Sequence, residues 1–419
     1  MRMEQIDGSS AVAQAAFSRT TVLIILALWL VLVVTSGQLI IIAPILPVIG
    51  DTFQIGEVKL GLLGLAYAGT LMVMALVAGP ISDRVGRRVI LLIGTGSMAL
   101  VLLLHWVASS YSMLMLVRLL TGMAGGVLSG SVVAYVGDYF SYERRGWATG
   151  WVMSGVAAGQ IVALPAAVWL AFRMDFRMPF VLFGFIMALA YLMILLFVPQ
   201  PAVVRSTERL ALRPAVMNYA ELIRDKATGG AVWAYFLMLG SGGLFLFFLA
   251  EWLETVHALT GPQIAGLFVA VGAVNLIGSP AGGRLSDHVG RKPVIVLMCV
   301  LLAAALVATT WVISGLLTAY LFIGLLVLLV ALRMSPMYAL MTALVADDRR
   351  GSLMSLSISF GQFGFGVGAA VAGILYARFG YISNTIASAL LALMMGVVIW
   401  HLLPEPPMSV RKAEGPGRE

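Results

Sequence analysis

The chain of 419 residues is 61% apolar and only 11% charged, and its formal net charge is +7 at pH 7. Soluble domains are about 45–50% apolar and about 25% charged, so this chain could not cover itself with polar groups in water. The composition therefore excludes a soluble protein and predicts an integral protein of a lipid bilayer.

Twelve apolar stretches follow one another along the chain. A helix of about 20 apolar residues crosses a hydrocarbon core about 30 Å thick. The first stretch is too long for the apolar part of a signal peptide, and no small-residue cleavage site follows it, so we expect it to be retained. We predict an all-α fold with twelve membrane-spanning helices, at residues 21–49, 59–80, 88–108, 111–138, 146–172, 179–199, 229–252, 263–284, 292–313, 315–344, 352–377 and 381–403.

A polar segment separates the first six predicted spans from the last six. Within it, the stretch PAVMNYAELIRDKA fits either a short amphipathic helix on the membrane surface or a plain linker. The predicted domains are an N-terminal six-helix bundle at 1–199, a central loop at 200–228, a C-terminal six-helix bundle at 229–403 and a tail at 404–419.

Lysine and arginine concentrate in alternate loops. Twenty of the 26 lie in the termini and in the loops that share a side with them, four lie on the other side, and Arg118 and Arg333 lie inside spans. Cytoplasmic loops carry such an excess, so we expect both termini in the cytoplasm, in a bacterial inner membrane. The basic charge thus reflects topology and indicates no nucleic-acid partner.

Two loops recur in the second half of the chain. GPISDRVGRR at 79–88 returns 204 positions later within GGRLSDHVGRKP, and ERRG at 143–146 returns as DRRG at 348–351. Two repeats at nearly one offset indicate duplication of a six-helix unit, which predicts two bundles related by a pseudo-two-fold axis.

The first repeated loop combines glycine, acid and arginine. Glycine can take the positive φ that a tight reversal needs, and the arginines lie where helix C-termini and anionic lipid headgroups attract cations. Plain anchoring on the cytoplasmic side would explain the arginines but not an aspartate at the same position of both loops. We therefore predict a gating motif of Gly79, Asp83, Arg84, Gly86, Arg87, Arg88, Gly283, Asp287, Gly290, Arg291 and Lys292.

The first loop resembles the signature loop of the major facilitator superfamily, and the resemblance extends over the whole chain. RRGWATGW after the fourth span belongs to this resemblance. APILPVIGDTF at the end of the first span and LVRLLTGMAGG in the fourth are similar to the family's drug-efflux branch. The resemblance implies that Asp83, with Arg87 and Arg88, forms a gate latch between the halves. Asp287 with Arg291 would be its weaker counterpart.

Two departures from that branch bear on the mechanism. Proton-coupled drug antiporters of the family commonly carry Gly-Pro-x-x-Gly-Gly in the fifth helix, where this chain has GVAAGQIVALPAA with Gln160 in place of the proline. They also often carry an acid in the first helix, where this chain has TSGQ. Both departures argue against drug–proton antiport.

Charged residues inside a bilayer point to a substrate or ion pathway. Arg118 in the fourth span either faces a cavity or extends to the nearby membrane surface. Arg333, in the middle of the tenth span, needs carbonyl groups, an acid or an anionic substrate. Glu251 is the predicted coupling carboxylate, although it and Glu254 lie close to the end of the seventh span, where plain exposure would also explain them.

Uncharged polar residues inside spans need partners as well. They lie in spans one, two, five, eight and eleven, which tend to line the cavity in the family that this chain resembles. We expect them to face the interior, where they touch either substrate or neighbouring helices; they are Gln38, Tyr67, Gln160, Asn275 and Gln362. His105, near a helix end, is predicted to be interfacial.

The sequence shows no P-loop, no nucleophile elbow and no metal-ligand spacing, so we expect neither an enzyme nor a cofactor or metal. We predict a secondary transporter, functional as a monomer, that moves a small molecule or ion by alternating access. Export of an organic solute is the first interpretation, with proton coupling left open. One alternative is anion uptake or facilitated passage at Arg118 and Arg333; another is a membrane scaffold or sensor that transports nothing.

Overall fold

The structure, a computed structural model, describes residues 19–201 and 212–405, except for the side chains at positions 80, 83, 142, 143, 212–216, 347 and 348. All regular secondary structure in these ranges is helical, and twelve segments are long and apolar enough to cross a membrane. The predicted all-α fold with twelve spans is therefore confirmed. The side chain of Asp83 lies outside the described residues.

The six spans of the first half include short helical pieces that continue or extend the long ones. The fifth span contains one turn of π-helix, η2, between α8 and α9. The elements are α2 (Arg19–Ile40), α3 (Leu46–Phe53), α4 (Glu57–Val85), α5 (Arg87–Leu104), η1 (His105–Val107), α6 (Tyr111–Leu128), α7 (Ser131–Tyr139), α8 (Tyr142–Ala158), η2 (Gly159–Ala163), α9 (Leu164–Arg173) and α10 (Met178–Phe197).

The second half repeats this arrangement. A helix that belongs to the central segment, α11, precedes it. The elements are α11 (Leu212–Arg224), α12 (Lys226–Leu246), α13 (Leu249–His257), α14 (Gly261–Val289), α15 (Arg291–Val312), α16 (Leu316–Thr342), α17 (Asp347–Phe379) and α18 (Tyr381–Leu402).

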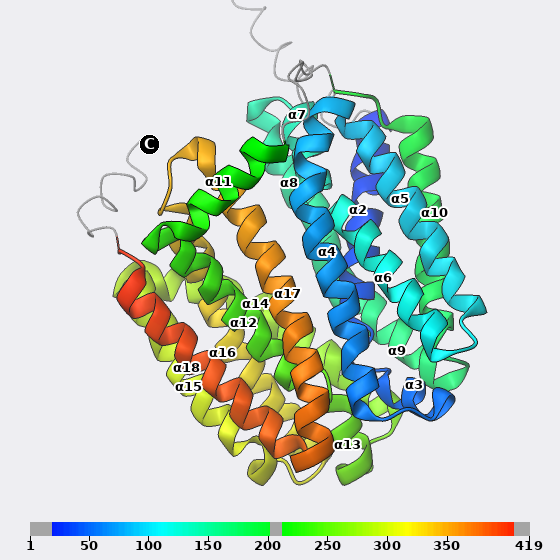
Figure 1. The fold of residues 1–419 in the computed structure, drawn as a ribbon, viewed down its shortest axis with the longest axis vertical. Coiled ribbons are helices and arrows are strands. Elements are labelled where there is room, and N and C mark those ends of the chain that lie inside the picture. The colour runs from blue at the N-terminus through cyan, green and yellow to red at the C-terminus, as the bar shows by residue number, and fades with distance from the viewer. Residues whose placement is uncertain (1–18, 202–211, 406–419) are drawn as a thin grey trace, which may run out of the picture.

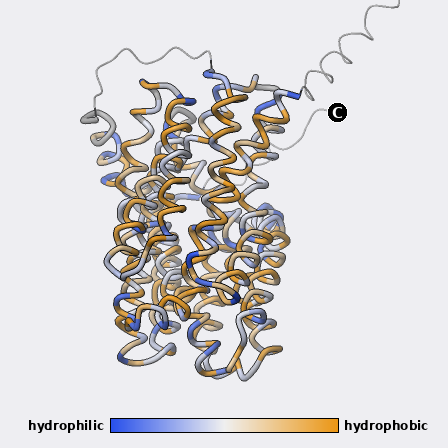
Figure 2. The backbone as a smooth tube through the Cα atoms, turned by 90° about the vertical axis from the view of Figure 1, so that its right-hand side faces the viewer, coloured by the Kyte–Doolittle hydropathy of each residue, from blue (hydrophilic) through white to orange (hydrophobic). Residues whose placement is uncertain are grey.

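The two halves form two bundles that stand side by side (Figure 1). They meet along α4 and α17 on one side of the molecule and along α9 and α14 on the other. We call the end that holds Gly86, Gly290 and α11 the basic end, which is at the top of Figure 1, and the end that holds Gln54 and Ala258 the opposite end. Apolar residues run along both bundles (Figure 2), as helices in lipid require.

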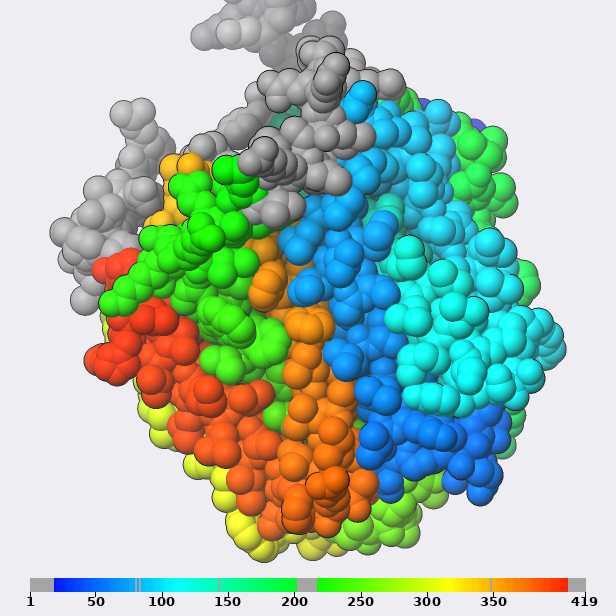
Figure 3. Space-filling model, viewed as in Figure 1, coloured from blue at the N-terminus to red at the C-terminus, as the bar shows by residue number. Residues whose placement is uncertain are grey.

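The central segment contains a helix and is not simply a linker. Leu222 of α11 is buried in a cluster with Val232 of α12 and Leu353 and Leu356 of α17. On the space-filling surface α11 covers the basic end of α17 (Figure 3). The helix therefore packs on the C-terminal bundle through its apolar face.

Asp225 begins α12 as its N-cap. Its carboxylate accepts hydrogen bonds from the backbone N–H groups of Thr228 at 2.9 Å and Ala227 at 3.1 Å. These bonds, that of Thr228 first, hold the pKa of Asp225 below its usual range. A carboxylate at this position also interacts favourably with the helix dipole.

We expect Asp225→Ala to lower the free energy of unfolding by about 1 kcal/mol at pH 7. The folded pKa is depressed, so the stabilisation is complete above the unfolded value of about 3.9 and is lost as the pH falls through the folded pKa. Denaturation at pH 7 and at low pH measures this: the difference from wild type shrinks below about pH 4. A difference that persisted in acid would show that the charge of Asp225 contributes nothing.

Candidate functional site

The seam between α4 and α17 is closed at the opposite end by direct helix contact. A Cβ atom added at Gly61 would lie 2.5 Å from the Ala369 carbonyl oxygen, and one at Gly64 would lie 2.8 Å from the Phe247 ring. A Cβ atom at Gly373 would collide with the Glu57 carbonyl oxygen. Glycine therefore permits a backbone approach that a larger residue would prevent.

The second seam, between α14 and the η2–α9 segment, is also closed towards the opposite end. A Cβ atom at Gly272 would lie 2.8 Å from the Ile161 side chain, and one at Gly261 would meet the Phe172 ring. All these glycines lie in the half of their span that is nearer the opposite end. The two bundles are therefore tightly joined there.

Contacts at the basic end are of another kind. An added Cβ atom at Gly79, Gly146 or Gly351 would meet nothing within 4 Å. Leu76 of α4 packs at the edge of the cluster around Leu222, so the bundles touch here through side chains. Side-chain contacts of this kind can separate without disrupting close backbone packing between the bundles.

A cavity lies between the bundles, beside the closely packed part of the seam at Gly64 and Phe247. The space open to a water-sized molecule is about 10 Å³, which is close to the least that holds one water. Residues of both bundles line it: Leu39, Ile42, Gly64, Tyr67, Ala68, Arg118, Phe247, Gln362 and Phe365. Three of the sequence-predicted candidates, Tyr67, Arg118 and Gln362, are thus brought together.

Arg118 is completely buried in this cavity wall and does not extend to the membrane surface. Its guanidinium carbon lies 4.6 Å from the centre of the Tyr67 ring. Its Nε and Nη1 atoms have no hydrogen-bond partner among the described residues. Gln38, also fully buried, donates from Nε2 to the Tyr67 hydroxyl at 2.9 Å, which fixes the ring beneath the guanidinium.

The other uncharged candidates lie near the seam without joining this cavity wall. Gln160 lies in the π-helical turn η2, a type of distortion that often marks functional sites, and it is half-buried. Asn275 of α14 is half-buried too. Whether these two side chains touch substrate stays a prediction.

Arg333 is 2% exposed, but it lies inside the C-terminal bundle and does not line the cavity. Its Nη1 atom lies 3.6 Å from both Cys299 Sγ and Met395 Sδ, which places it among α15, α16 and α18. The structure therefore separates the two intramembrane arginines: Arg118 faces the space between the bundles, and Arg333 packs within one of them.

Glu251 lies in a second pocket, at the opposite end. This pocket has a volume of about 180 Å³, and Asp51 and Glu57 of the N-terminal bundle share its wall with Glu251 of α13. The buried Oε2 atoms of Glu251 and Glu254 have no hydrogen-bond partner among the described residues. The described part of the chain holds no group of three or more His, Cys, Asp or Glu side chains placed to bind a metal ion. Because they share this pocket, carboxylates of the two bundles face each other across the seam.

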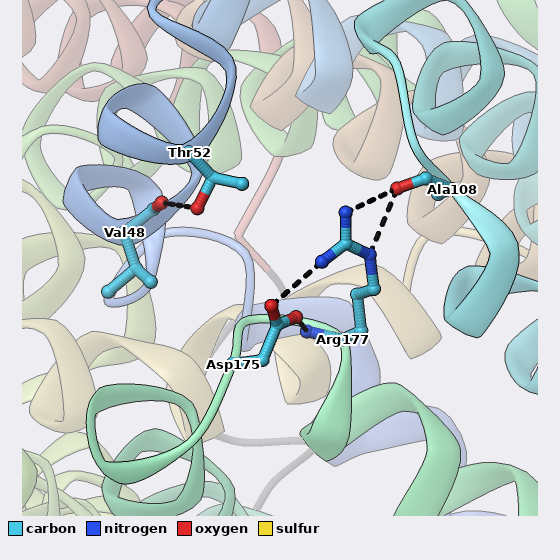
Figure 4. A network of polar contacts seen from close by, with 5 residues as sticks. All are labelled: Val48, Thr52, Ala108, Asp175 and Arg177. Atoms are coloured by element: carbon cyan, nitrogen blue, oxygen red, sulfur yellow. Dashed lines mark hydrogen bonds and ion pairs between the residues drawn. The ribbon is translucent and has the colours of Figure 1, made fainter.

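The wall of the N-terminal bundle beside this pocket is held by Arg177, at the start of α10. Its Nη1 atom lies 2.7 Å from Asp175 Oδ2, and Nε and Nη2 both donate to the Ala108 carbonyl oxygen, at 2.9 and 2.7 Å (Figure 4). Phe176 packs edge-on against Phe53 of α3. These contacts join α3, α10 and the loop before α6 into one unit.

The first repeated loop turns as its glycine predicts. Gly86 has φ +110°, in the region that L side chains rarely adopt. Arg87 Nε donates to Asp138 Oδ2 of α7 at 2.6 Å, and Arg88 donates from Nη2 to the Leu195 carbonyl oxygen of α10 at 2.8 Å. The Gln200 side chain accepts from the Arg88 N–H at 3.1 Å and so caps α5. These contacts lie within the N-terminal bundle, and the latch role of Asp83 stays a prediction.

The second loop has the same backbone geometry and its own set of polar contacts. Gly290 also has φ +110°. Glu405 takes the place of the capping side chain and accepts from the Arg291 N–H at 2.7 Å. Arg291 Nη1 donates to the Ala339 carbonyl oxygen at 2.8 Å, whereas Asp287 is exposed.

Several parts of these sites could not be found from the sequence. His105, expected at the interface, is fully buried and stacks on Phe180 with ring centres 4.0 Å apart. Gln200 and Glu405 could have been found from the internal repeat, because they lie at nearly equivalent positions, shortly after the last span of each half. Asp51 and Glu57 gave no signal, because acids near helix ends are common on any membrane protein.

Comparison with known proteins agrees with this architecture. The multidrug resistance protein MdtG of Serratia proteamaculans (strain 568) is 24% identical over 404 residues, covering 92% of this chain and 94% of its own. The uncharacterised MFS-type transporter YceJ of Bacillus subtilis (strain 168) is 27% identical over 359 residues, covering 83% of this chain and 89% of its own.

Solved structures show the same fold. A bacterial homologue of the human lysosomal transporter Spinster, in an inward-facing and occupied conformation, superposes with a TM-score of 0.74 at 17% identity, covering 90% of this chain and 95% of its own. A D-xylose–proton symporter has a TM-score of 0.73 at 17% identity, covering 91% and 98%. The sequence model of the Major Facilitator Superfamily matches residues 28–274 and again 231–418. The chain therefore belongs to the Major Facilitator Superfamily of membrane transporters.

Proposed function

We propose that this transporter exports a small organic solute from the cytoplasm by alternating access, as a monomer in a bacterial inner membrane. The observation that carries the proposal is the asymmetry of the seam: glycine-mediated helix contacts join the bundles at the opposite end, whereas Leu76 of α4, at the basic end, meets the other bundle through its side chain. A cavity with polar side chains lies between these two ends.

The orientation follows from the charges. Basic loops remain on the cytoplasmic side of membranes, so we place the basic end and both termini in the cytoplasm. The closed opposite end then faces outward, and solute would reach the cavity from the inside when the bundles separate at the basic end. The multidrug resistance protein among its relatives supports export as the direction.

We further propose that protons couple to transport at Glu251. Its carboxylate faces Asp51 and Glu57 across the seam, so ionised side chains would repel and protonation would favour closure at the opposite end. Like charges held this close in a partly desolvated pocket interact more strongly than in water. Glu251 would thereby link the proton gradient to the closing step.

Glu251→Gln tests this coupling. We expect counterflow exchange to continue in proteoliposomes, because a neutral side chain permits closure. Uphill transport driven by a pH gradient should fall at least about tenfold, since no proton is carried. Thr255→Val, one turn further along α13, is the matched control and should leave both activities unchanged. Equal loss of exchange and of uphill transport would contradict coupling at Glu251.

Counterflow with reconstituted protein tests the transport function itself. Solutes that stabilise the purified protein against heat are loaded into proteoliposomes, and entry of the labelled solute is followed. We expect saturable exchange for at least one of them. Ligand binding without exchange of any bound solute would favour a scaffold or sensor.

A further inference from the structure

The guanidinium of Arg118 is a buried cation without an acidic partner among the residues that the structure describes. The side chain has no exposed surface, and no described carboxylate lies within ion-pair distance of it. Two of its three nitrogen atoms, Nε and Nη1, are buried and donate to nothing among the described residues. Burial of an unpaired charge is costly, so the structure retains here a binding capacity that its own residues do not use.

The surroundings of Arg118 define what could use this capacity. The residues that line the cavity with it include no acid, and they offer the rings of Tyr67, Phe247 and Phe365 together with the amide of Gln362. Tyr67 is held against the guanidinium by Gln38 and already uses the face of its ring in a cation–π contact. A planar anion at the guanidinium edge would therefore lie beside aromatic surfaces of both bundles.

We infer that the solute is an aromatic or bulky apolar molecule with a single carboxylate, and that this carboxylate pairs with Arg118. This inference rests on the proposed function, because it takes the cavity between the bundles as the transport site. A guanidinium presents parallel N–H donors that match a carboxylate in a bidentate pair. The rings of Phe247 and Phe365, from the C-terminal bundle, would cover the apolar body.

Other solute classes fit less well. An organic cation would meet the buried charge of Arg118 with no carboxylate in the cavity wall to offset it. A neutral solute would leave the guanidinium unpaired. A dianion such as phosphate would find a single cation, since Arg333 lies among Cys299 and Met395 inside the C-terminal bundle.

The cavity also links binding to the conformational cycle. The free space of about 10 Å³ is too small for an aromatic ring, so the solute enters only when the bundles separate. Arg118 and Tyr67 belong to one bundle and Phe247 and Phe365 to the other. A bound monocarboxylate would thus contact both moving parts and could favour their closure around it.

The test measures ligand-dependent thermal stabilisation of the purified full-length protein in detergent. The probes are benzoate, phenylacetate and 1-naphthoate, each paired with its neutral amide. We expect the carboxylates to raise the unfolding temperature saturably, in order of apolar size, and the amides to have no effect. Equal stabilisation by acid and amide, or no response to any carboxylate, would overturn the inference.

Variants assign the effect to the site. Arg118→Gln should raise the Kd for 1-naphthoate at least about 30-fold, as expected when one partner of a desolvated ion pair is removed. Arg333→Gln, which alters the other buried arginine, should leave that Kd unchanged. Phe365→Ala, which keeps the charge, should weaken 1-naphthoate more than benzoate and supplies the test if Arg118→Gln does not fold. Unchanged affinity in either cavity variant would contradict the assignment.

Counterflow separates this inference from the proposed function. Carboxylate binding at Arg118 without any flux would sustain the ligand assignment and refute transport. Saturable exchange of a neutral or cationic solute, with no carboxylate carried, would sustain transport and refute the assignment of substrate class.

Discussion

Gly61→Val should reduce transport about 10- to 100-fold, because the added methyl groups occupy the space of the Ala369 carbonyl oxygen when the opposite end closes. Overpacking of a tight contact costs about 1–3 kcal/mol, and here the cost falls only on states in which this seam is closed. The variant should therefore favour states that are open at the opposite end. Counterflow measures the loss of flux, and thiol labelling at the opposite end measures the shift in population.

Gly69→Val is the matched control for this prediction. Gly69 lies on the same helix, α4, but an added Cβ atom there meets nothing within 4 Å. The control carries the same change of helix propensity without blocking the seam, so it should transport at close to the wild-type rate. Equal losses in both variants would mean that the closeness of α4 and α17 has no role in the cycle.

Gly86→Ala should destabilise the protein by about 1–3 kcal/mol, the cost of placing an L side chain in a backbone region that favours glycine. The φ angle of +110° is reached in the single residue between α4 and α5. The new Cβ atom would also lie 2.9 Å from Gln200 Nε2, which belongs to the side chain that caps α5. Unfolding in a denaturant titration should shift accordingly.

A second glycine shows whether the φ angle is the cause. Gly146, in the helical part of α8, has nothing within 4 Å of an added Cβ atom. Gly146→Ala should be neutral or stabilising by up to about 1 kcal/mol, since alanine favours helix. If Gly86→Ala were equally harmless, the strained turn would not hold these two helices in place.

The membrane explains why so much of the fold could be predicted. Every backbone group in a bilayer needs an internal partner, so long apolar runs must be helices, and twelve of them are found within residues 19–201 and 212–405. The repeated loop was equally informative, because Gly86 and Gly290 adopt the same φ angle in the two halves. Apolar runs and glycine turns depend on residues that are neighbours in the chain, so the sequence shows them directly.

The breaks within spans were not predicted. The first predicted span is interrupted after Ile40, where α2 ends. The seventh is interrupted after Leu246, where α12 ends, and continues from Leu249 as α13. Apolar composition does not change at either point, since a segment that packs on the other bundle is as apolar as one that faces lipid. The two short helices α3 and α13, which contact each other across the seam, were therefore invisible in the hydropathy.

The two intramembrane arginines show the same limit at the level of the site. Arg118 and Arg333 are both deep, both buried and both without a described acidic partner, yet only Arg118 lines the cavity. Successive residues of a helix are rotated by about 100° about the helix axis, and this rotation decides which face a residue occupies. These helices are apolar on all faces, because lipid and the protein interior favour the same side chains. The sequence therefore does not show which face is turned to the cavity.

The most direct test of the account locks the opposite end. In a Cys299→Ser background, cysteines replace Gln54 at the end of α3 and Glu254 on α13, on the two sides of the seam. A short cleavable bifunctional reagent then links them, and exchange of the carried solute is measured in proteoliposomes before and after cleavage. We expect flux at background level while the link is intact and recovery when it is cut. Undiminished flux through the linked protein would contradict the movement of two bundles about a shared cavity.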